Sequence, residues 1–373
     1  MKTFINTCIH FFKKETVLCI AGFLAFISAF FVHPSAAYMG YIDFRVLSLL
    51  FSLMLVVAGF QSIGLFHCLG SALLTKVHTT RQLILVLSLL CFFSSMFITN
   101  DVALLTFVPF AIMILTMAGQ QKLLISTIVL QTIGANLGSM FTPVGNPQNL
   151  YLASAFSLST GTFLIRMFPL TALSLVLLVA AACMLPSTPV DIASQTAAER
   201  PEPKKLAVYL VLFMTCLGCV SHLIPYPVML VLVLITLLFI NRTLFQKADY
   251  FLLLTFVFFF LFIGNVQNIP AVSDLLHKLI RGRELGAGIL LSQCISNVPA
   301  AILLSGFTDQ VIPLLYGVNI GGLGTLIASL ASLISYRFYV GTENAHTGRY
   351  MKVFTLYNVI FLIILALMAW KIL

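Results

Sequence analysis

The sequence predicts an all-α polytopic membrane protein built as an inverted repeat, with two re-entrant hairpins and two broken transmembrane helices. Three observations lead to this prediction. The 373 residues are 60% hydrophobic and 8% charged, whereas soluble domains usually contain about a quarter charged residues. A short polar stretch interrupts a long apolar run in each half. In each half, a second stretch rich in glycine and asparagine then breaks another apolar run.

The two halves share two sequence patterns in the same order. Ile98-Thr99-Asn100-Asp101-Val102-Ala103 is matched by Ile295-Ser296-Asn297-Val298-Pro299-Ala300, an offset of 197 residues (296 minus 99). Gly134-Ala135-Asn136-Leu137-Gly138 is matched by Gly317-Val318-Asn319-Ile320-Gly321, an offset of 183 residues (317 minus 134). The second offset also aligns a threonine of each half, Thr142 with Thr325. Two matched pairs in one order indicate an internal duplication.

We expect the first repeat at residues 1–185, a polar cytoplasmic linker at 186–205, and an extra span followed by the second repeat at 206–373. Crossing the hydrocarbon core takes about 20 apolar residues in a helix. The expected spans and broken spans lie at about 17–33, 45–60, 121–155, 163–185, 206–222, 226–240, 250–264, 311–337 and 353–371. The shorter mixed stretches 62–76 and 268–280 are expected to lie flat at the membrane interface.

The expected hairpins lie at about 83–118 and 286–308, with tips at 99–101 and 296–298. The arms beside the first tip are about 16 residues long, which suits a chain that turns back near the membrane midplane. Two ordinary spans are the alternative. The break at 142–149 contains two prolines and a glycine, so a helix cannot continue through it. The corresponding break in the second half lies at 321–325.

The distribution of Lys and Arg predicts the orientation. With four full crossings in each half, the extra span at 206–222 sets the second half upside down. Alternate assignment of loops then places 14 of the 20 basic residues on the side of the N-terminus. The other 6 are Arg45, Arg166, Lys278, Arg281, Arg283 and Lys371. Basic loops favour the cytoplasm, so we expect a cytoplasmic N-terminus and an external C-terminus. A re-entrant hairpin adds no crossing and an ordinary pair of spans adds two, so either choice gives the same orientation for the other segments.

A helix that starts or stops in mid-membrane exposes unpaired N–H or C=O groups with partial charges of opposite sign. Helices that start after Asp101 and after Val298 would direct N–H groups at the centre and attract an anion, whereas the carbonyls that end the preceding arms suit Na⁺. The side chains that could orient a small polar solute there are those of Thr99, Asn100, Ser296 and Asn297. Helix capping alone is the alternative role for each of them.

Asp101 is the one acidic residue of eleven that falls at predicted membrane depth. An ionisable group there is costly and indicates function, so we expect Asp101 to carry a proton, bind a cation, or both. The alternative is a carboxylate that only caps the helix following it, where the helix dipole favours negative charge.

The two breaks are expected to face the tips and complete two half-sites with backbone carbonyls and side-chain amides. The residues expected to bind substrate or ion are Thr99, Asn100, Asp101, Asn146, Gln148, Asn149, Ser296, Asn297, Asn319 and Thr325. A coupling Na⁺ is expected near Asn100, Gly145, Asn146, Asn297 and Gly324. For the second break, helix packing through small residues is the alternative. No other cofactor is expected.

Other classes of site find little support. The eight cysteines are expected to be free thiols, and the Cys216 and Cys219 pair is expected to pack on one face of a lipid-embedded helix. Nucleic acid is not an expected partner, because the basic residues are scattered. We do not expect an enzyme, because the seven histidines fall at ends or loops and neither HExxH nor GxSxG occurs.

The motifs at the tips and breaks resemble those of the ion transporter superfamily, which includes arsenical pumps, sodium/proton antiporters, and citrate and divalent anion/sodium symporters. The resemblance covers essentially the whole chain and is strongest to uncharacterised bacterial inner-membrane anion permeases. The residues that carry it are Thr99-Asn100-Asp101-Val102-Ala103, Gly138 to Asn149, and Ser292 to Ala300. It implies inverted repeats, opposed hairpins, a homodimer and elevator-like alternating access.

Each tip of the divalent anion symporters carries Ser-Asn-Thr, which binds the substrate carboxylate. Here Asn100 and Asn297 keep the middle position, but the third position is Asp101 in one half and Val298 in the other. A carboxylate at that place would repel a dicarboxylate unless it were protonated or paired with a cation. Arsenite-type members are similar to this chain in having an Asp after the Asn, which implies proton exchange for a neutral or anionic oxyacid.

The sequence therefore predicts a secondary transporter of a small anion or oxyacid in the bacterial cytoplasmic membrane, coupled to H⁺ or Na⁺. A Na⁺/H⁺ antiporter is the alternative within transport. Outside that class, a channel and an intramembrane enzyme are the competing hypotheses.

Overall fold

The computed structural model describes residues 15–74, 77–190, 201–343 and 345–373, and these residues are mainly helical. Within these ranges, six helices are long and apolar enough to cross a membrane. They are α4 (Phe44–Ser62), α7 (Asn100–Met117), α10 (Thr160–Cys183), α11 (Pro203–Val220), α13 (Tyr250–Gln267) and α19 (Thr347–Ile372). The prediction of an all-α polytopic membrane protein is confirmed.

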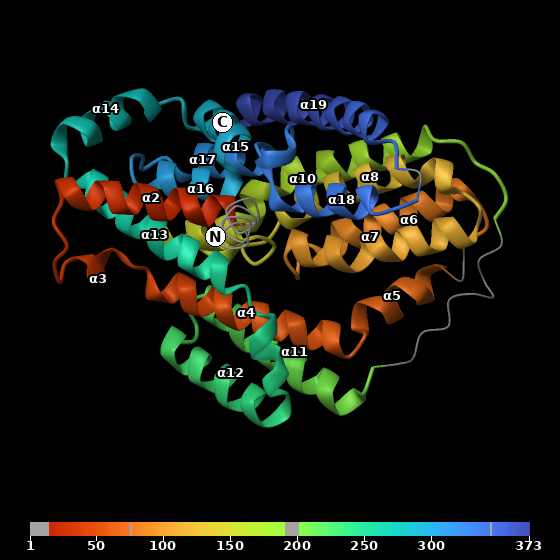
Figure 1. Ribbon diagram of the computed structural model, residues 1–373, viewed down its shortest axis with the longest axis horizontal. Helices are drawn as coiled ribbons and strands as arrows, with labels where there is room; N and C mark the ends of the chain where they lie inside the picture. Colours follow the sequence, from red (N-terminus) through yellow and green to blue (C-terminus); the bar gives the residue numbers. More distant parts are fainter. Residues whose placement is uncertain (1–14, 75–76, 191–200, 344) are drawn as a thin grey trace, which may run out of the picture.

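One group of helices stands to the side of the rest. In it α4 packs against α11 and α12 (Tyr226–Ile240), while α2 (Thr16–Phe31) lies along α13 (Figure 1). Asp43 and Asp249 cap α4 and α13, accepting hydrogen bonds from the backbone N–H groups of Val46 at 3.0 Å and Leu252 at 2.9 Å. These two acidic residues therefore have a structural role at helix starts.

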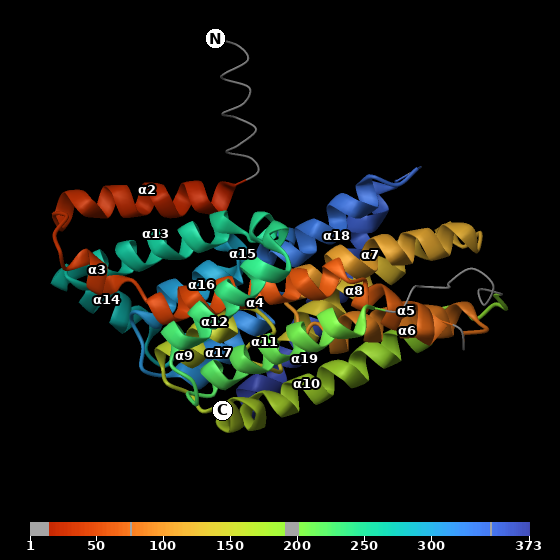
Figure 2. The same cartoon turned by 90° about the horizontal axis from the view of Figure 1, so that it is seen from below.

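Two short helices connect this outer group to the centre. They are α5 (Leu65–Leu74) and α14 (Pro270–Ile280), which lie at opposite ends of the molecule in both views (Figures 1 and 2). At 1.5 Å per residue each is about 15–17 Å long, too short to cross a hydrocarbon core of about 30 Å. Other short elements outside the two breaks are α3 (Tyr38–Tyr41), η1 (Gln121–Leu123) and η2 (Arg242–Lys247).

The central group contains both predicted hairpins and both predicted breaks. Its helices are α6 (Thr80–Ser94), α7, α8 (Leu124–Ser139), α9 (Pro147–Ala155), α10, α15 (Glu284–Ile295), α16 (Asn297–Ser305), α17 (Val311–Ile320), α18 (Leu330–Val340) and α19. The broken spans are thus α8 with α9, and α17 with α18. The second break is longer than expected from the sequence, because η3 (Leu326–Ala328) follows residues 321–325 before α18 begins.

The helices of the two expected hairpins differ in length. Helices α15 and α16 meet at Ser296 and are about 18 Å and 14 Å long, so neither could cross the membrane alone. Helix α7 is about 27 Å long and qualifies as a spanning helix. Re-entrance stays a prediction for both pairs.

The glycines of the two repeated strings let helix backbones touch. A Cβ at Gly138 would lie 2.7 Å from Ser95 Oγ and closer still to the Phe92 carbonyl oxygen. A Cβ at Gly321 would likewise lie 2.7 Å from Ser292 Oγ. Helix α8 therefore packs closely on α6, and α17 on α15. Small residues at such contacts are a common means of helix association in membranes.

The first residues of the expected linker form hydrogen bonds with the N-terminal end of α6. The backbone N–H of Thr80 donates to the Thr188 carbonyl at 2.9 Å, and the Thr80 hydroxyl donates to the Pro186 carbonyl at 2.9 Å. Thr79 and Pro189 form an isolated antiparallel bridge. The polar composition of 186–205 suggested a linker, but its first residues are paired with the chain.

We predict that Gly138→Ala lowers the free energy of unfolding by about 1–3 kcal/mol, because the new methyl group would overlap backbone that cannot move away easily. Thermal unfolding of the purified protein in detergent measures the effect. Gly161→Ala in α10 is the matched control, because nothing lies within 4 Å of its Cβ position. Equal stability of the two variants would contradict the close contact.

Candidate ion and substrate site

Four helices of the central group begin at the two tips and the two breaks. They are α7 at Asn100, α9 at Pro147, α16 at Asn297 and α18 at Leu330. Helix α7 packs on α18, and α16 packs on α9, so each tip lies beside the break of the other half. Helix N-termini carry partial positive charge, and here several of them gather around one polar network.

Asn136 is the hub of one half of this network. Its Oδ1 accepts hydrogen bonds from Asn100 Nδ2 at 2.9 Å and from Ser329 Oγ at 3.0 Å. Its Nδ2 donates to the Gly322 carbonyl at 3.4 Å. The side chain is 4% exposed. Asn136 therefore joins the tip of the first half to the break of the second half.

Asn319 is the hub of the other half. Its Oδ1 accepts from Asn146 Nδ2 at 3.3 Å, and its Nδ2 donates to Asn149 Oδ1 at 2.7 Å. The aligned glycine strings make Asn319 the counterpart of Asn136, 183 residues away, and the same offset makes Ser329 the counterpart of Asn146 (329 minus 146). Corresponding residues thus donate to corresponding hubs.

Each tip is also held to the break of its own half. The backbone N–H of Asn100 donates to the Gly145 carbonyl at 3.2 Å, and Ser296 Oγ donates to the Ala328 carbonyl at 3.4 Å. The two carbonyls are 183 residues apart (328 minus 145). These bonds fix where each tip lies relative to the broken helix.

Matched threonines reinforce this attachment. The hydroxyl of Thr142 donates to the Met96 carbonyl, and the hydroxyl of Thr325 donates to the Gln293 carbonyl at 3.2 Å. Thr325, expected to bind substrate or ion, is exposed and is used to join the second break to α15. The contact explains why both halves carry a threonine at this place.

Ser296 has a strained backbone at the second tip. Its φ of 75° and ψ of 155° lie in a region that is normally restricted to glycine and costs about 1–3 kcal/mol for other residues. The surrounding hydrogen bonds hold it there. Strain of this kind is concentrated at functional sites.

Polar atoms at the first tip lack some of the partners expected of them within the part of the chain that the structure describes. Thr99 forms no side-chain hydrogen bond as the cap of α7, and Asp101 Oδ1 is buried without a partner. Gln148 is 1% exposed. Buried polar groups are normally satisfied. Groups left open beside helix N-termini are therefore candidates to meet a solute, an ion or water.

Sequence reasoning located the tips and breaks but missed some of the residues that connect them. Asn136 lies in the repeated glycine string, which could have identified it, because its counterpart Asn319 was recognised. Gln293 lies within the motif Ser292 to Ala300 but was assigned no role, and Ser329 gave no signal, since the importance of both depends on three-dimensional contacts. Conversely, Asn146 and Asn149 were expected to bind a solute or ion, and the structure uses their amides inside the network.

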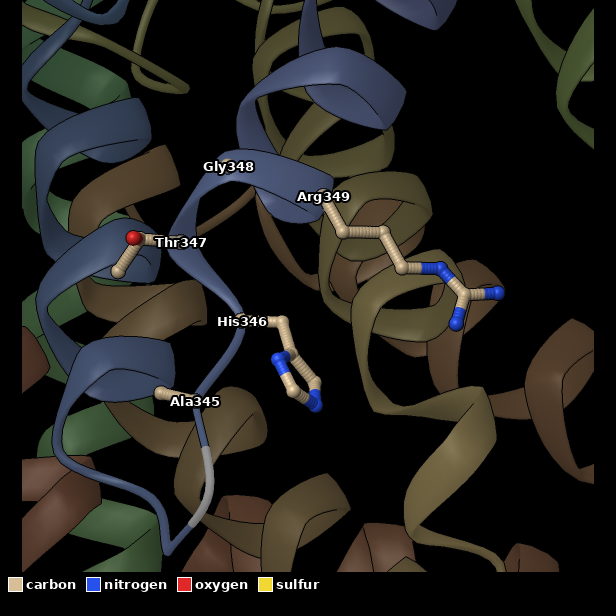
Figure 3. Close-up of a pocket in the computed structure, with 5 residues that line it drawn as sticks. All are labelled: Ala345, His346, Thr347, Gly348 and Arg349. Carbon is tan, nitrogen blue, oxygen red and sulfur yellow. The ribbon is translucent and has the colours of Figure 1, made fainter.

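A pocket at the start of α19 lies at the protein surface and differs from this buried site. It is lined by Ala345, His346, Thr347, Gly348 and Arg349. The side chains of His346 and Arg349 point to the same side of the chain and lie at the exposed surface (Figure 3). The pocket lacks the buried polar groups of the central network.

The cysteines form no alternative site. All seven cysteines among the described residues are free, including the buried Cys216 and Cys219. Cys8 lies outside the described residues.

These features define a polytopic membrane transporter of the ion transporter superfamily. The sequence profile of the family described as citrate transporter, CitMHS, matches residues 4–310. The chain belongs to this family, whose members are transporters and not enzymes.

Individual relatives agree with this assignment. The chain is 32% identical over 332 residues to the uncharacterized transporter MJ0456 of Methanocaldococcus jannaschii, covering 87% of this chain and 88% of that protein. It is 32% identical over 343 residues to the inner membrane protein YbiR of Escherichia coli, covering 89% and 88% respectively. It is also 32% identical over 129 residues to the silicon efflux transporter LSI3 of Oryza sativa, covering 34% and 26%.

We predict that Asn319→Leu lowers the free energy of unfolding by about 1–3 kcal/mol for each amide that it leaves buried and unpaired. Asn358→Leu in α19 is the matched control, because Asn358 is equally buried and donates only within its own helix, to the Phe354 carbonyl at 2.9 Å. Thermal unfolding in detergent compares the two variants. A larger loss in Asn358→Leu would contradict the role of Asn319 as a hub.

Proposed function

We propose that this protein is a secondary active transporter that moves a small anion or oxyacid across the bacterial cytoplasmic membrane, coupled to H⁺ or Na⁺. The observation that carries the proposal is the gathering of four helix N-termini around a buried network of neutral amides and hydroxyls. Unpaired N–H groups at helix N-termini favour an anion or the oxygen atoms of a neutral oxyacid. The membership of a transporter family supports translocation.

The type of side chain at the site favours a weakly charged solute. Among the described residues, the side chains of the network are asparagine, glutamine, serine and threonine, without Lys or Arg in its hydrogen bonds. A multivalent anion would be expected to meet guanidinium or ammonium groups. The name of the rice relative assigns silicon efflux to that protein, and silicon dissolves as an oxyacid, which fits the same chemistry.

Asp101 supplies the proposed coupling. Its position in the other half is taken by Val298, so only one of the two tips carries an acidic side chain. An unpaired, buried carboxylate oxygen is costly unless the group binds a proton or a cation. Binding and release of the proton or cation by Asp101 would then accompany movement of the solute.

We propose that the two halves form an inverted repeat that supports alternating access. The support is the pairing of contacts: α2 with α13 and α12 with α4, α7 with α18 and α16 with α9. In chain order α2 corresponds to α12, α4 to α13, α7 to α16 and α9 to α18. Replacing each helix by its counterpart in the other repeat therefore converts the first contact of each pair into the second. By family resemblance we further propose a homodimer, elevator-like movement and a cytoplasmic N-terminus.

A Na⁺/H⁺ antiporter is the second candidate. The specific observation in its favour is again Asp101, because one carboxylate that binds Na⁺ and H⁺ in turn could exchange the two cations without any anion.

We predict that purified protein in liposomes produces a saturable internal pH change when a suitable anion or oxyacid is added, and that Asp101→Asn abolishes this change, because an amide cannot carry the proton. An internal pH dye measures it, with candidates that include citrate, silicate and arsenite. Asp274→Asn on the exposed face of α14 is the control and should behave like wild type.

Two results would count against the proposal. A pH change driven by Na⁺ alone and lost in Asp101→Asn would establish the antiporter. Unaltered proton movement in Asp101→Asn would remove Asp101 from the coupling mechanism and leave it as a helix cap.

A further inference from the structure

Two short helices carry the same sequence pattern in the two halves of the chain. Leu65-Phe66-His67-Cys68-Leu69 in α5 corresponds to Leu275-Leu276-His277-Lys278-Leu279 in α14, an offset of 210 residues (277 minus 67). Helix α5 directly follows α4 of the outer group, and α14 directly follows α13 (Figures 1 and 2). The proposed site uses neither of these short helices.

The matched histidines make the same contact in both halves. The ring of His67 meets that of Phe110 in α7 edge to face, with centroids 5.1 Å apart and an interplanar angle of 68°. His277 meets Phe307, just after α16, at 5.7 Å and 77°. Edge-to-face packing is a favoured geometry for such rings. The two phenylalanines are themselves counterparts, because they differ by the offset of 197 residues that relates the two tips (307 minus 110).

Matched glutamines add a second contact at each place. Gln61, near the end of α4, donates from Nε2 to Thr106 Oγ1 of α7 at 3.2 Å. Gln267, the last residue of α13, donates from Nε2 to the Gly306 carbonyl at 2.7 Å. The glutamines are 206 residues apart (267 minus 61), which is also the offset between the caps of α4 and α13 (249 minus 43). The end of each outer helix is therefore bonded to the expected hairpin of its own half.

We refer to each set of contacts as a hinge clamp. The first clamp consists of Gln61 and His67 on Thr106 and Phe110, and the second consists of Gln267 and His277 on Gly306 and Phe307. Both phenylalanines are buried, whereas both histidines are exposed. Each clamp thus joins the outer group and its short connecting helix to the segment that follows one tip.

Other contacts between the outer and central groups occur in one half only. Helix α9 packs on α4, and α16 packs on α13. Their counterparts, α18 on α13 and α7 on α4, are not formed to a comparable extent among the described residues. Tyr151 of α9 illustrates the difference, because its ring lies 5.7 Å from that of Phe260 in α13. The counterpart of Tyr151 in α18 is Ile334 (151 plus 183), which has no aromatic ring.

An inverted repeat allows these contacts to be sorted by their persistence. If the two halves exchange conformations during alternating access, a contact present in one half only is made in one access state and lost in the other. A contact present in both halves persists through the exchange. The hinge clamps belong to the second class, and the contact of Tyr151 with α13 belongs to the first.

We propose that Gln61, His67, Gln267 and His277 are positioning residues, which form two matched hinge clamps that hold the segments after both tips to the outer group in both access states. The proposal rests on the proposed function, because it gives these residues a part in that transport. Elements that absorb a conformational change set its rate. The clamps therefore govern the turnover rate and leave the affinity for the solute unchanged.

Hydrogen exchange tests whether a clamp holds its segment, and it needs no substrate. Gln267→Ala with His277→Ala changes two exposed side chains and removes the second clamp. We expect backbone amides of residues 304–310 to exchange at least about threefold faster than in wild type, because local attachment limits opening. Gln267→Ala with His277→Phe keeps a ring against Phe307 and should restore most of the protection.

His33→Ala is the control for the exchange measurement, because it changes an exposed histidine outside both clamps. Its exchange in residues 304–310 should equal that of wild type. Exchange that is equally slow in the clamp variant would overturn the proposal.

Transport kinetics in proteoliposomes measure the consequence for turnover. Loss of the second clamp should lower the maximal rate about tenfold and change KM less than about twofold, because the clamp does not contact the solute site. The variant with His277→Phe should recover much of the rate. A raised KM at an unchanged maximal rate would contradict a positioning role.

A tether tests persistence through the transport cycle. In a background without other cysteines, Gln61→Cys with Thr106→Cys removes the hydrogen bond of the first clamp, and a short bifunctional thiol reagent then links the two positions. Linking should restore at least about half of the lost rate, because a persistent contact can be made permanent without harm. Linking Tyr151→Cys to Phe260→Cys should instead stop transport.

The outcomes separate the proposal from the proposed function. A clamp tether that stops transport as completely as the tether at Tyr151 would overturn the proposal and leave the proposed function standing. Absence of flux in wild type for every anion and oxyacid would refute the proposed function. Hydrogen exchange would then still decide whether the clamps hold the segments after the tips.

Discussion

The arrangement of this protein depends on one constraint: a helix that is interrupted inside a membrane must find partners for its backbone groups within the protein. Both broken spans, α8 with α9 and α17 with α18, meet this constraint through side-chain amides. The carbonyls that end the first helices face Asn149 and Gln293, and the second helices begin at residues that donate to Asn319 or Asn136. The interruption thereby becomes a fixed polar centre.

That centre is symmetric in position and asymmetric in chemistry. Asn136 and Asn319 accept hydrogen bonds from corresponding residues of the opposite break, which ties the two halves together at one place. The tips differ, because one carries Asp101 and the other carries Val298 beside the strained Ser296. A proton could therefore be loaded on one side of a centre that otherwise consists of neutral groups. This difference supports coupled transport by a membrane protein of the citrate transporter family.

Much of the fold could be predicted from the sequence, because in a membrane the apolar runs and their interruptions report directly on helices and breaks. The repeated strings around Asn100 and Asn297, and the glycine strings that include Gly138 and Gly321, located the centre. The partners of Asn149 and Gln293 could not be predicted, because they depend on distances between segments far apart in the chain. The pairing of residues 185–190 with the start of α6 could not be predicted either. The polar composition of this segment is equally typical of a linker that makes no contacts.

The central claim is that both tips contribute to one solute site. The most direct measurement places a single cysteine at Thr99→Cys or at Ser296→Cys in a background without other cysteines, and records the rate of alkylation by a small thiol reagent. The account predicts that one transported anion slows alkylation at both positions with the same concentration dependence. Protection at neither position, or at one position alone, would contradict a shared site.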